Sequence, residues 1–227
     1  MNNTFECCMP SKSNNATGEE KRIISALEEG IVFGQFAPRE RLVESDLMAQ
    51  FHTRRHIIRS AISELERFGL VIRRPNRGAS VCDLTREQIS NLYDMRIVLQ
   101  DAAAKCLALP VSTSVLADLH SQQSQYETAI AENDLRAAFR ANDKFHDILN
   151  GLVTNPYLRD TLVMYTLRTK LARFTAFRRS TLFEDHWQQH GAIIDALGSG
   201  DCARLNRLLI AHLEASKNAY LAGLGTH

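Results

Sequence analysis

The order of local patterns between residues 18 and 82 restricts the fold more than any other feature of this chain. Apolar residues recur at helical spacing in three successive segments, which are 18–33, 43–51 and 56–71. Two short strand-like runs then follow, at 70–74 and 78–82, joined by the turn sequence RPNRG. The order helix, helix, turn, helix, hairpin predicts a winged helix-turn-helix, in which three helices carry a β-hairpin wing.

The third helical segment has one apolar face. Its inward positions are Ile58, Ala61, Ile62 and Leu65. Gly69 is expected to end this helix, because glycine adopts the left-handed conformation of a helix terminus at little cost. At the start of the second segment, either Ser45 or Glu44 offers a side chain that is suited to cap the helix.

The charge of the chain is unevenly distributed. The net charge of +1 indicates no particular partner. Residues 52–82 nevertheless hold seven arginines and two glutamates, so seven minus two leaves a local excess of five positive charges. From residue 83 onward, fifteen basic residues balance sixteen acidic ones. One basic patch on a neutral protein is typical of a phosphate-binding surface, whereas the charges taken alone would indicate a solvated helix face.

The basic patch gathers where a recognition helix would meet DNA. The N-terminal end and outer face of the third helix carry Arg54, Arg55, His56 and Arg59. At the wing tip, Arg77 stands beside Gly78, and a glycine there lets the backbone approach the minor groove or the phosphates. Arginine binds guanine edges bidentately or clamps phosphates, so these six residues are the predicted DNA contacts.

The stretch from Ile31 to Val81 resembles the DNA-binding domain of the GntR family of regulators. The resemblance is carried by GQFAPRERL, by Glu44 with Leu47, by Arg55 with Arg59, by LERFGLV and by PNRG. It implies that Arg55 and Arg59 contact operator DNA and that the wing tip reaches the adjacent groove.

Four positions depart from the family pattern. His52 stands where the family has a glycine, and His56-Ile57 where it has a Thr-Pro pair. Ser45 replaces an arginine that contacts bases in some members. The operator sequence is therefore not transferable from the family to this chain.

Beyond residue 83 the strand-like alternation disappears. Helices are predicted over 85–109, 112–131, 134–150, 155–178, 181–198 and 200–223. An antiparallel all-α bundle of this size buries its own core and is able to enclose a pocket. We therefore divide the chain into a disordered arm at 1–17, the winged helix-turn-helix at 18–82 and a helical domain at 83–227.

Composition favours a cytoplasmic location. No apolar run approaches the roughly 18 residues that a membrane-spanning helix needs, and the polar N-terminus lacks a secretory signal. The five cysteines are odd in number and irregularly spaced, which suits neither a disulfide framework nor a cysteine-based zinc site.

Polar residues from three of the predicted helices are candidates for a metal site. Asn142 and His146 are four residues apart and so share one helix face, while His190 and His212 lie in later helices. Imidazoles that converge with an oxygen ligand suit Zn²⁺ or Ni²⁺. From the residues alone, a histidine that is satisfied within the core is the more common case. His186, one turn before His190, is either a supporting or an exposed residue.

Three segments of the helical part resemble the FCD effector domain of the FadR-type branch of GntR regulators. These are NDKFHDILNG, HGAIIDALGSGD and AHL. The resemblance implies a divalent metal ion held by Asn142, His146, His190 and His212, and it implies dimerisation and effector binding by residues 83–227. Asn142 stands where the family usually has an aspartate. The neighbouring Asp143 lies about 100° further round the helix, off the face that carries the ligands, so the ligand set is neutral.

Arg96 is the predicted effector-binding residue. In the family this arginine is followed four residues later by a glutamate, which is Gln100 here. A buried arginine without a carboxylate partner is costly, and a carboxylate effector between it and the metal would compensate it. The alternative is a partly exposed arginine bonded to helix ends or to Asp94 or Asp101. The basic residues between Arg168 and Arg179 are expected to be mostly solvated or at a subunit interface, with one of them available to line the pocket.

Together these features predict a ligand-responsive transcriptional regulator, expected to be a repressor. A homodimer would hold double-stranded, pseudo-palindromic operator DNA, and a small organic acid would change its affinity. One alternative is a metalloregulator in which the ion itself is the signal. A metal-dependent hydrolase with a DNA-binding head is a second, but the chain has no zincin-type His-Glu pair and no Ser-His-Asp or glycine-rich phosphate motif. We therefore expect no enzymatic activity.

Overall fold

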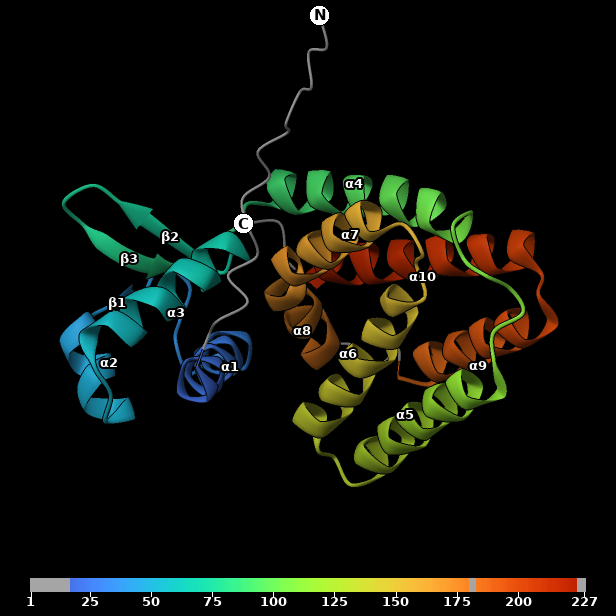
Figure 1. Cartoon of the computed structure of the whole chain (residues 1–227), viewed down its shortest axis with the longest axis horizontal. Helices are drawn as coiled ribbons and strands as arrows, with labels where there is room; N and C mark the ends of the chain where they lie inside the picture. The colour runs from blue at the N-terminus through green and yellow to red at the C-terminus, as the bar shows by residue number, and fades with distance from the viewer. Residues whose placement is uncertain (1–16, 180–182, 224–227) are drawn as a thin grey trace, which may run out of the picture.

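The computed structural model describes residues 17–179 and 183–223, which form two groups of elements (Figure 1). The predicted disordered arm over 1–17 lies outside this range except for Thr17, whose side chain caps the first helix. None of the helices in the described ranges is long and apolar enough to cross a membrane.

The first group is a winged helix-turn-helix, and the predicted fold class is confirmed. Its elements are α1 (Gly18–Val32), β1 (Arg41–Leu42), α2 (Glu44–Phe51), α3 (Arg55–Arg67), β2 (Val71–Arg74) and β3 (Gly78–Val81). The sheet is antiparallel with the strand order β1-β3-β2. The sequence predicted only the two-stranded wing, because the third strand is two residues long and too short to show alternation.

The core of this group is the apolar face that the sequence indicated. Ile58, Ala61, Ile62 and Leu65 of α3 are buried against α1 and the sheet. Gly69 follows α3 with a φ of 73°, as expected for its role in ending the helix. The predicted cap of α2 is wrong, since the cap residue is Val43 and it makes no side-chain cap bond. Glu44 and Ser45 instead lie in the first turn of α2, where an acidic side chain favours the helix dipole.

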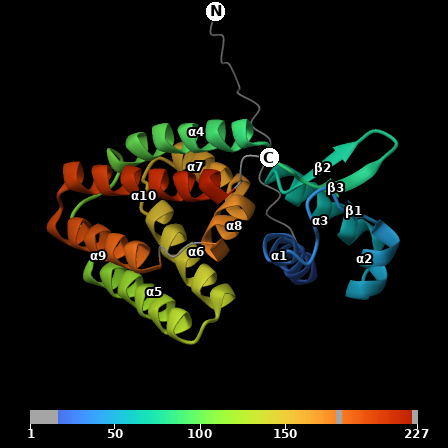
Figure 2. The ribbon, with the colours of Figure 1, turned by 180° about the vertical axis from the view of Figure 1, so that it is seen from behind.

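The second group is entirely helical within the described residues. It consists of α4 (Arg86–Ala104), α5 (Thr113–Ala131), α6 (Leu135–Gly151), α7 (Pro156–Arg168), α8 (Lys170–Arg179), α9 (Phe183–Ser199) and α10 (Cys202–Gly223). In Figures 1 and 2, α4 and α10 run side by side, with α7 beside α4 and with α5 beside α6 and α9. The helices α6, α9 and α10 surround the interior in which the candidate metal ligands lie.

The helix predicted over 155–178 is two helices that meet at Thr169. The hydroxyl group of Thr169 donates to the carbonyl oxygens of the preceding turn, with Oγ1 at 3.0 Å from the oxygen of Thr166. Threonines whose hydroxyl groups donate to a carbonyl oxygen of the preceding turn bend helices. Arg96 of α4 donates a hydrogen bond to the same hydroxyl. The helix predicted over 85–109 also stops early, at Ala104, and Leu107 pairs instead with Val153.

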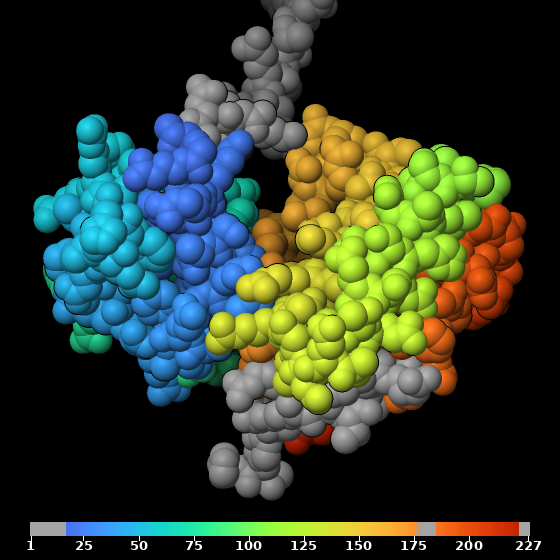
Figure 3. All heavy atoms as spheres, turned by 90° about the horizontal axis from the view of Figure 1, so that it is seen from below, coloured from blue at the N-terminus to red at the C-terminus, as the bar shows by residue number. Residues whose placement is uncertain are grey.

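The two groups contact each other through α1. Figure 3 shows α1, in blue, against the yellow atoms of α6. Arg140 of α6 donates from two nitrogen atoms to the two carboxylate oxygens of Glu29 on α1, each at 2.9 Å. Lys170 of α8 binds Glu28, one residue earlier on α1. Charged side chains therefore connect the DNA-binding group to two helices of the bundle.

Candidate functional site

The outer face of α3 and the wing form one basic groove. Arg54 is the N-cap residue of α3, and Arg54, Arg55, His56 and Arg59 are all exposed. The groove has a volume of about 630 Å³ and lies between α2, the start of α3 and the sheet. Besides Arg55 and Arg59, the arginines that line it are Arg41, Arg73 and Arg74. These three were not predicted as contacts, although the charge excess of residues 52–82 includes two of them.

Glu44 holds the two predicted contact arginines of α3 together. Its carboxylate accepts a hydrogen bond from Nε of Arg59 at 2.9 Å, and Nε of Arg55 lies 3.8 Å away. Arg73 of the wing donates to the carbonyl oxygen of Arg59 and to the hydroxyl of Ser63. The recognition helix and the wing are thus joined in one surface before any DNA binds.

The wing tip is shaped by left-handed backbone. Asn76 has a φ of 61° and Gly78 a φ of 73°, which reverses the chain tightly between β2 and β3. The side chain of Arg77 is exposed at this tip. A Cβ atom on Gly78 would have Nε of Arg41 as its nearest neighbour at 3.7 Å, so the backbone at Gly78 is open to a close approach.

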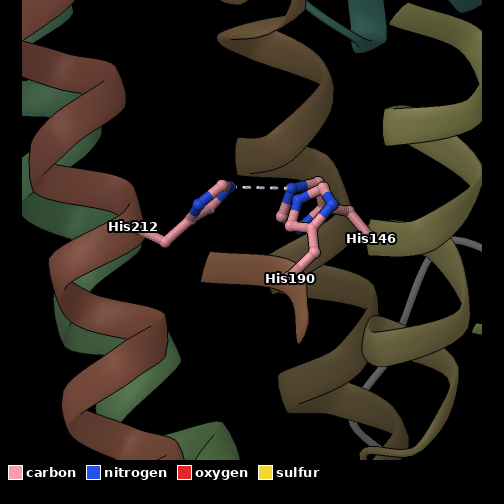
Figure 4. Close-up of side chains that lie close together, drawn as sticks. All are labelled: His146, His190 and His212. Carbon is pink, nitrogen blue, oxygen red and sulfur yellow. Dashed lines mark hydrogen bonds between the residues drawn. The ribbon is translucent and has the colours of Figure 1, made fainter. Parts of the chain in front are cut away.

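In the bundle, three histidines from three helices converge (Figure 4). Potential ligand atoms of His146 on α6, His190 on α9 and His212 on α10 all lie within 4.8 Å of one another. Nε2 of His146 and Nε2 of His212 are 3.1 Å apart. Asn142 is buried and lines the same cavity as His146 and His212. All four residues predicted as metal ligands are therefore brought to one place.

The protonation of these rings suits metal binding. Burial lowers the pKa of His190 to about 3. Burial, followed by the proximity of the other histidines, lowers the pKa values of His146 and His212 well below the usual range. The imidazoles are therefore neutral at pH 7, which is the form that ligates metal ions.

Hydrogen bonding around the rings gives a test of whether they fit a metal ion. Oε1 of Gln189 lies 2.6 Å from Nδ1 of His212, so Nδ1 donates to it and Nε2 keeps its lone pair. Neither ring nitrogen of His190 has a hydrogen-bond partner among the described residues, although both are buried. Buried polar atoms are rarely left without a partner in folded proteins. The donor set fits a divalent ion.

Arg96 is buried in the same cavity. Its side chain is 4% exposed and donates from one terminal nitrogen to Oγ1 of Thr169 at 3.1 Å, while Nε has no partner among the described residues. Burial, followed by the nearby charge of Arg173, lowers the pKa of Arg96 to about 10. The alternative of a partly exposed arginine is wrong because the side chain is buried, and Asp94 and Asp101 pair instead with Lys217 and Lys105.

Two further residues line the cavity, Arg173 and His186, and the sequence had left the role of each open. Arg173 of α8 is 7% exposed and lines the cavity, so it is the arginine of this segment that the sequence expected near the pocket without identifying it. Lys170 in the same helix is also largely buried, so the prediction of a solvated side chain is wrong there. The side chains of Arg178 and Arg179 lie outside the described part. His186 is buried beside the cavity with no hydrogen-bond partner for either ring nitrogen in the described ranges, which rules out the exposed alternative.

Comparison with protein families divides the chain in the same way. Residues 19–81 match the family described as bacterial regulatory proteins, gntR family, and residues 91–215, more than half of the chain, match the FCD domain.

Individual proteins agree with these matches. The HTH-type transcriptional repressor RspR of Escherichia coli is 26% identical over 194 residues, covering 86% of this chain and 85% of its own. The galactonate operon transcriptional repressor of the same organism is 26% identical over 199 residues, covering 79% and 87%. The structure of E. coli McbR/YncC superposes with a TM-score of 0.80 at 16% identity, over 92% of this chain and all of that one, which supports the fold.

Proposed function

Because the chain belongs to the gntR family of bacterial transcriptional regulators and carries an FCD domain, we propose that a small organic acid, bound beside a divalent metal ion in the bundle, controls its hold on operator DNA. We further propose that it acts as a repressor in the cytoplasm, as a homodimer. The observation that carries this proposal is the cavity in which three neutral histidines and two buried arginines meet.

Asn142, His146, His190 and His212 would hold the metal ion. Zinc–nitrogen bonds of about 2.0–2.1 Å place nitrogen ligands roughly 3.3 Å apart in a tetrahedron. The 3.1 Å between the Nε2 atoms of His146 and His212 is close to this separation. Nitrogen ligands favour Zn²⁺ or Ni²⁺ over Mg²⁺ and Ca²⁺. The ion would supply positive charge and an open coordination position to a carboxylate.

Arg96 is the residue of this chain that supports an acidic effector. It lies buried in the cavity, and no carboxylate is among the described residues that line it. A buried cation without a counter-charge is costly, and an anionic ligand removes that cost. One relative is named as the repressor of a galactonate operon, and galactonate is itself a carboxylate. The cavity of about 20 Å³ is little larger than one water needs, so an acid must displace lining side chains to enter.

On the DNA side, α3 would enter the major groove and the wing tip the adjacent groove. Arg54, Arg55, His56, Arg59, Arg77 and Gly78 are the proposed contacts. Two copies would read a pseudo-palindromic operator. Met95 and Val98 on α4 and Tyr157 on the adjacent α7 are exposed apolar side chains, and we place the contact between the two copies there.

The metalloregulator is the second candidate, favoured by the histidines alone. The ion would then change operator affinity without any organic ligand. In a metalloregulator the two buried arginines would have no role, because a divalent cation between neutral ligands does not relieve buried positive charge. The acid-responsive regulator therefore accounts for more of the cavity.

Elemental analysis and native mass spectrometry of the purified full chain test the proposal. We expect a dimer with one zinc or nickel ion per chain, and a small acid released on denaturation. The His190→Ala variant should lose the ion, whereas His120→Ala, an exposed histidine on α5, should retain it. A wild-type chain that holds no divalent ion, even after incubation with Zn²⁺, would contradict the metal site.

A further inference from the structure

Arg173 is shared between the cavity and a carboxylate behind it. One terminal nitrogen, NH2, donates to Oδ1 of Asp143 at 2.8 Å. Its Nε and other terminal nitrogen are buried without a hydrogen-bond partner among the described residues. Arg96, the other guanidinium of the cavity, also has an unpartnered Nε in that part of the chain. Two buried cations with free donors in one cavity indicate an anion that binds both.

Asp143 is connected to Glu28 on α1 through Lys170. Its second oxygen lies 2.6 Å from Nζ of Lys170, and the same Nζ lies 2.5 Å from Oε1 of Glu28. The side chains of Asp143, Glu28 and Lys170 are only 15%, 17% and 20% exposed, so water screens these pairs weakly. Four charged groups therefore run without a gap from the cavity to the DNA-binding domain.

We propose that an anion in the cavity binds Arg173 together with Arg96, and that Arg173 transmits the event through Asp143 and Lys170 to Glu28 on α1. This inference rests on the proposed function, since it assigns a binding residue and a route of regulation to the same cavity. The ligand class is a small carboxylate with at least two oxygens, which matches the planar donor fork of arginine.

The direction of the effect follows from competition for charge. An anion that takes the free nitrogens of Arg173 weakens its bond to Asp143. Asp143 then attracts Lys170 more strongly, and Lys170 binds Glu28 less strongly. Because α1 packs directly against α3, a looser α1 changes the position of the recognition helix relative to the bundle. An anion that binds the two arrangements with different affinity shifts the equilibrium between them.

The chain contains a matched control for this route. Glu29 is the next residue on α1 and also forms an ion pair with the bundle, through Arg140 of α6. Those two side chains are 47% and 46% exposed, and neither lines the cavity with the histidines. An effect of general domain contact should appear in both pairs, whereas a signal from the cavity should appear only at Glu28.

The first experiment measures anion binding to the purified full chain with acetate, oxalate and citrate as probes. Trp187, the only tryptophan in the sequence, follows His186 directly and packs against the hydrophobic cluster that contains Phe139, so its fluorescence reports on the cavity. We expect at least one probe to bind, and Arg173→Gln to bind it at least tenfold more weakly. Arg173→Lys keeps a charge for Asp143 but lacks the fork and should be intermediate, while Arg140→Gln should match the wild type.

The outcomes separate the two proposals, with circular dichroism melts confirming that each variant is folded. If the Arg173 variants bind the probe as the wild type does, the inference is overturned and the proposed function stands. If no probe binds the wild type, the proposed function fails and the inference fails with it.

The second experiment measures transmission. Operator affinity is determined by fluorescence anisotropy, on a duplex that the protein selects from a random pool, with and without the anion that binds. The wild-type affinities should differ by about 5- to 150-fold. Glu28→Gln should bring this ratio close to one while anion affinity stays within twofold, and Glu29→Gln should keep the wild-type ratio. A full ratio in Glu28→Gln, or an equal loss in both variants, would overturn the route.

Discussion

The DNA-binding group and the helical bundle both depend on arginines, but they hold them in opposite environments. Arg55 and Arg59 are each 61% exposed and stand beside Glu44, so their charge is hydrated in the free protein. Arg96 and Arg173 are buried, with donors that have no partner in the described part of the protein. The first pair suits a polyanion that releases counterions, and the second suits a small anion that neutralises charge held at a cost.

The largest expected effect tests the exposed side of this comparison. In the double variant Arg55→Ala/Arg59→Ala, operator affinity should fall at least about 30-fold, because each specific arginine contact contributes about 1–3 kcal/mol. The melting temperature should barely change, since exposed ion pairs contribute about 0–1 kcal/mol. Fluorescence anisotropy measures the affinity. Arg207→Ala, an exposed arginine on α10, should bind DNA as the wild type does. Unchanged operator binding in the double variant would refute the role of α3.

The next effect lies in the bundle, at a residue that touches a proposed metal ligand. Gln189 accepts a hydrogen bond from Nδ1 of His212 and so fixes the ring that presents Nε2 to the cavity. In Gln189→Ala, metal affinity should fall about 10- to 100-fold, as is usual when the partner of a ligating histidine is removed. Competition with a chromophoric chelator measures this. Gln125→Ala, which removes an exposed glutamine of α5, is the control, and equal affinities in both variants would contradict the assignment.

The same contrast explains what the sequence was able to predict. The helices and the wing follow from periodic patterns, whereas the convergence of the histidines was implied by the resemblance to the FCD domain and not by the residues alone. The position of Arg173 follows from neither, because the sequence between Arg168 and Arg179 contains several cations that look alike. Burial singles out Arg173, and it results from the packing of α8 on α6, where Asp143 lies.

Two local features were hidden for a different reason. No proline or glycine marks the break between α7 and α8 at Thr169. At this position the threonine hydroxyl donates a hydrogen bond to the carbonyl oxygen of Thr166 and accepts one from Arg96. The strand β1 has only two residues, and its identity depends on pairing with β3. The strand depends on a contact between distant residues and the break on the backward bond of one hydroxyl, and a periodic pattern contains neither.

A third prediction concerns pH and the metal-free chain, prepared with a chelator. His190 has a pKa of about 3 in the folded chain, because of burial, against about 6.5 when unfolded. The unfolded state therefore binds more protons between these values, so stability is complete above pH 6.5 and falls as the pH is lowered toward 3. At pH 5 the loss from His190 alone should be about 2 kcal/mol. Urea unfolding followed by Trp187 fluorescence at pH 7.5 and 5 measures it.

The controls for this pH dependence come from both regions. His190→Gln should unfold with a flatter dependence on pH, because it removes one group that must stay neutral. His56→Gln, which changes an exposed histidine at the start of α3, away from the buried cluster, is the matched control. A wild-type chain whose stability is the same at both pH values would show that the buried histidines are not held neutral.

The smallest effect is expected at Glu44, where the exposed arginines are already paired. In Glu44→Gln, the free energy of unfolding should change by less than about 1 kcal/mol, because the pair with Arg59 is solvated. Operator affinity should rise a few-fold at low salt, since a negative charge leaves the groove that the phosphates approach. Salt screens that charge, with a Debye length of about 10 Å at 0.1 M and about 3 Å at 1 M, so the gain should shrink as salt increases.

Gln50→Glu on the exposed side of α2, outside the groove, is the matched charge control and should weaken binding less than Glu44→Gln strengthens it. Weaker binding in Glu44→Gln would instead mean that Glu44 holds Arg59 in its DNA-reading position, and the exposed region would then be preorganised as the buried one is.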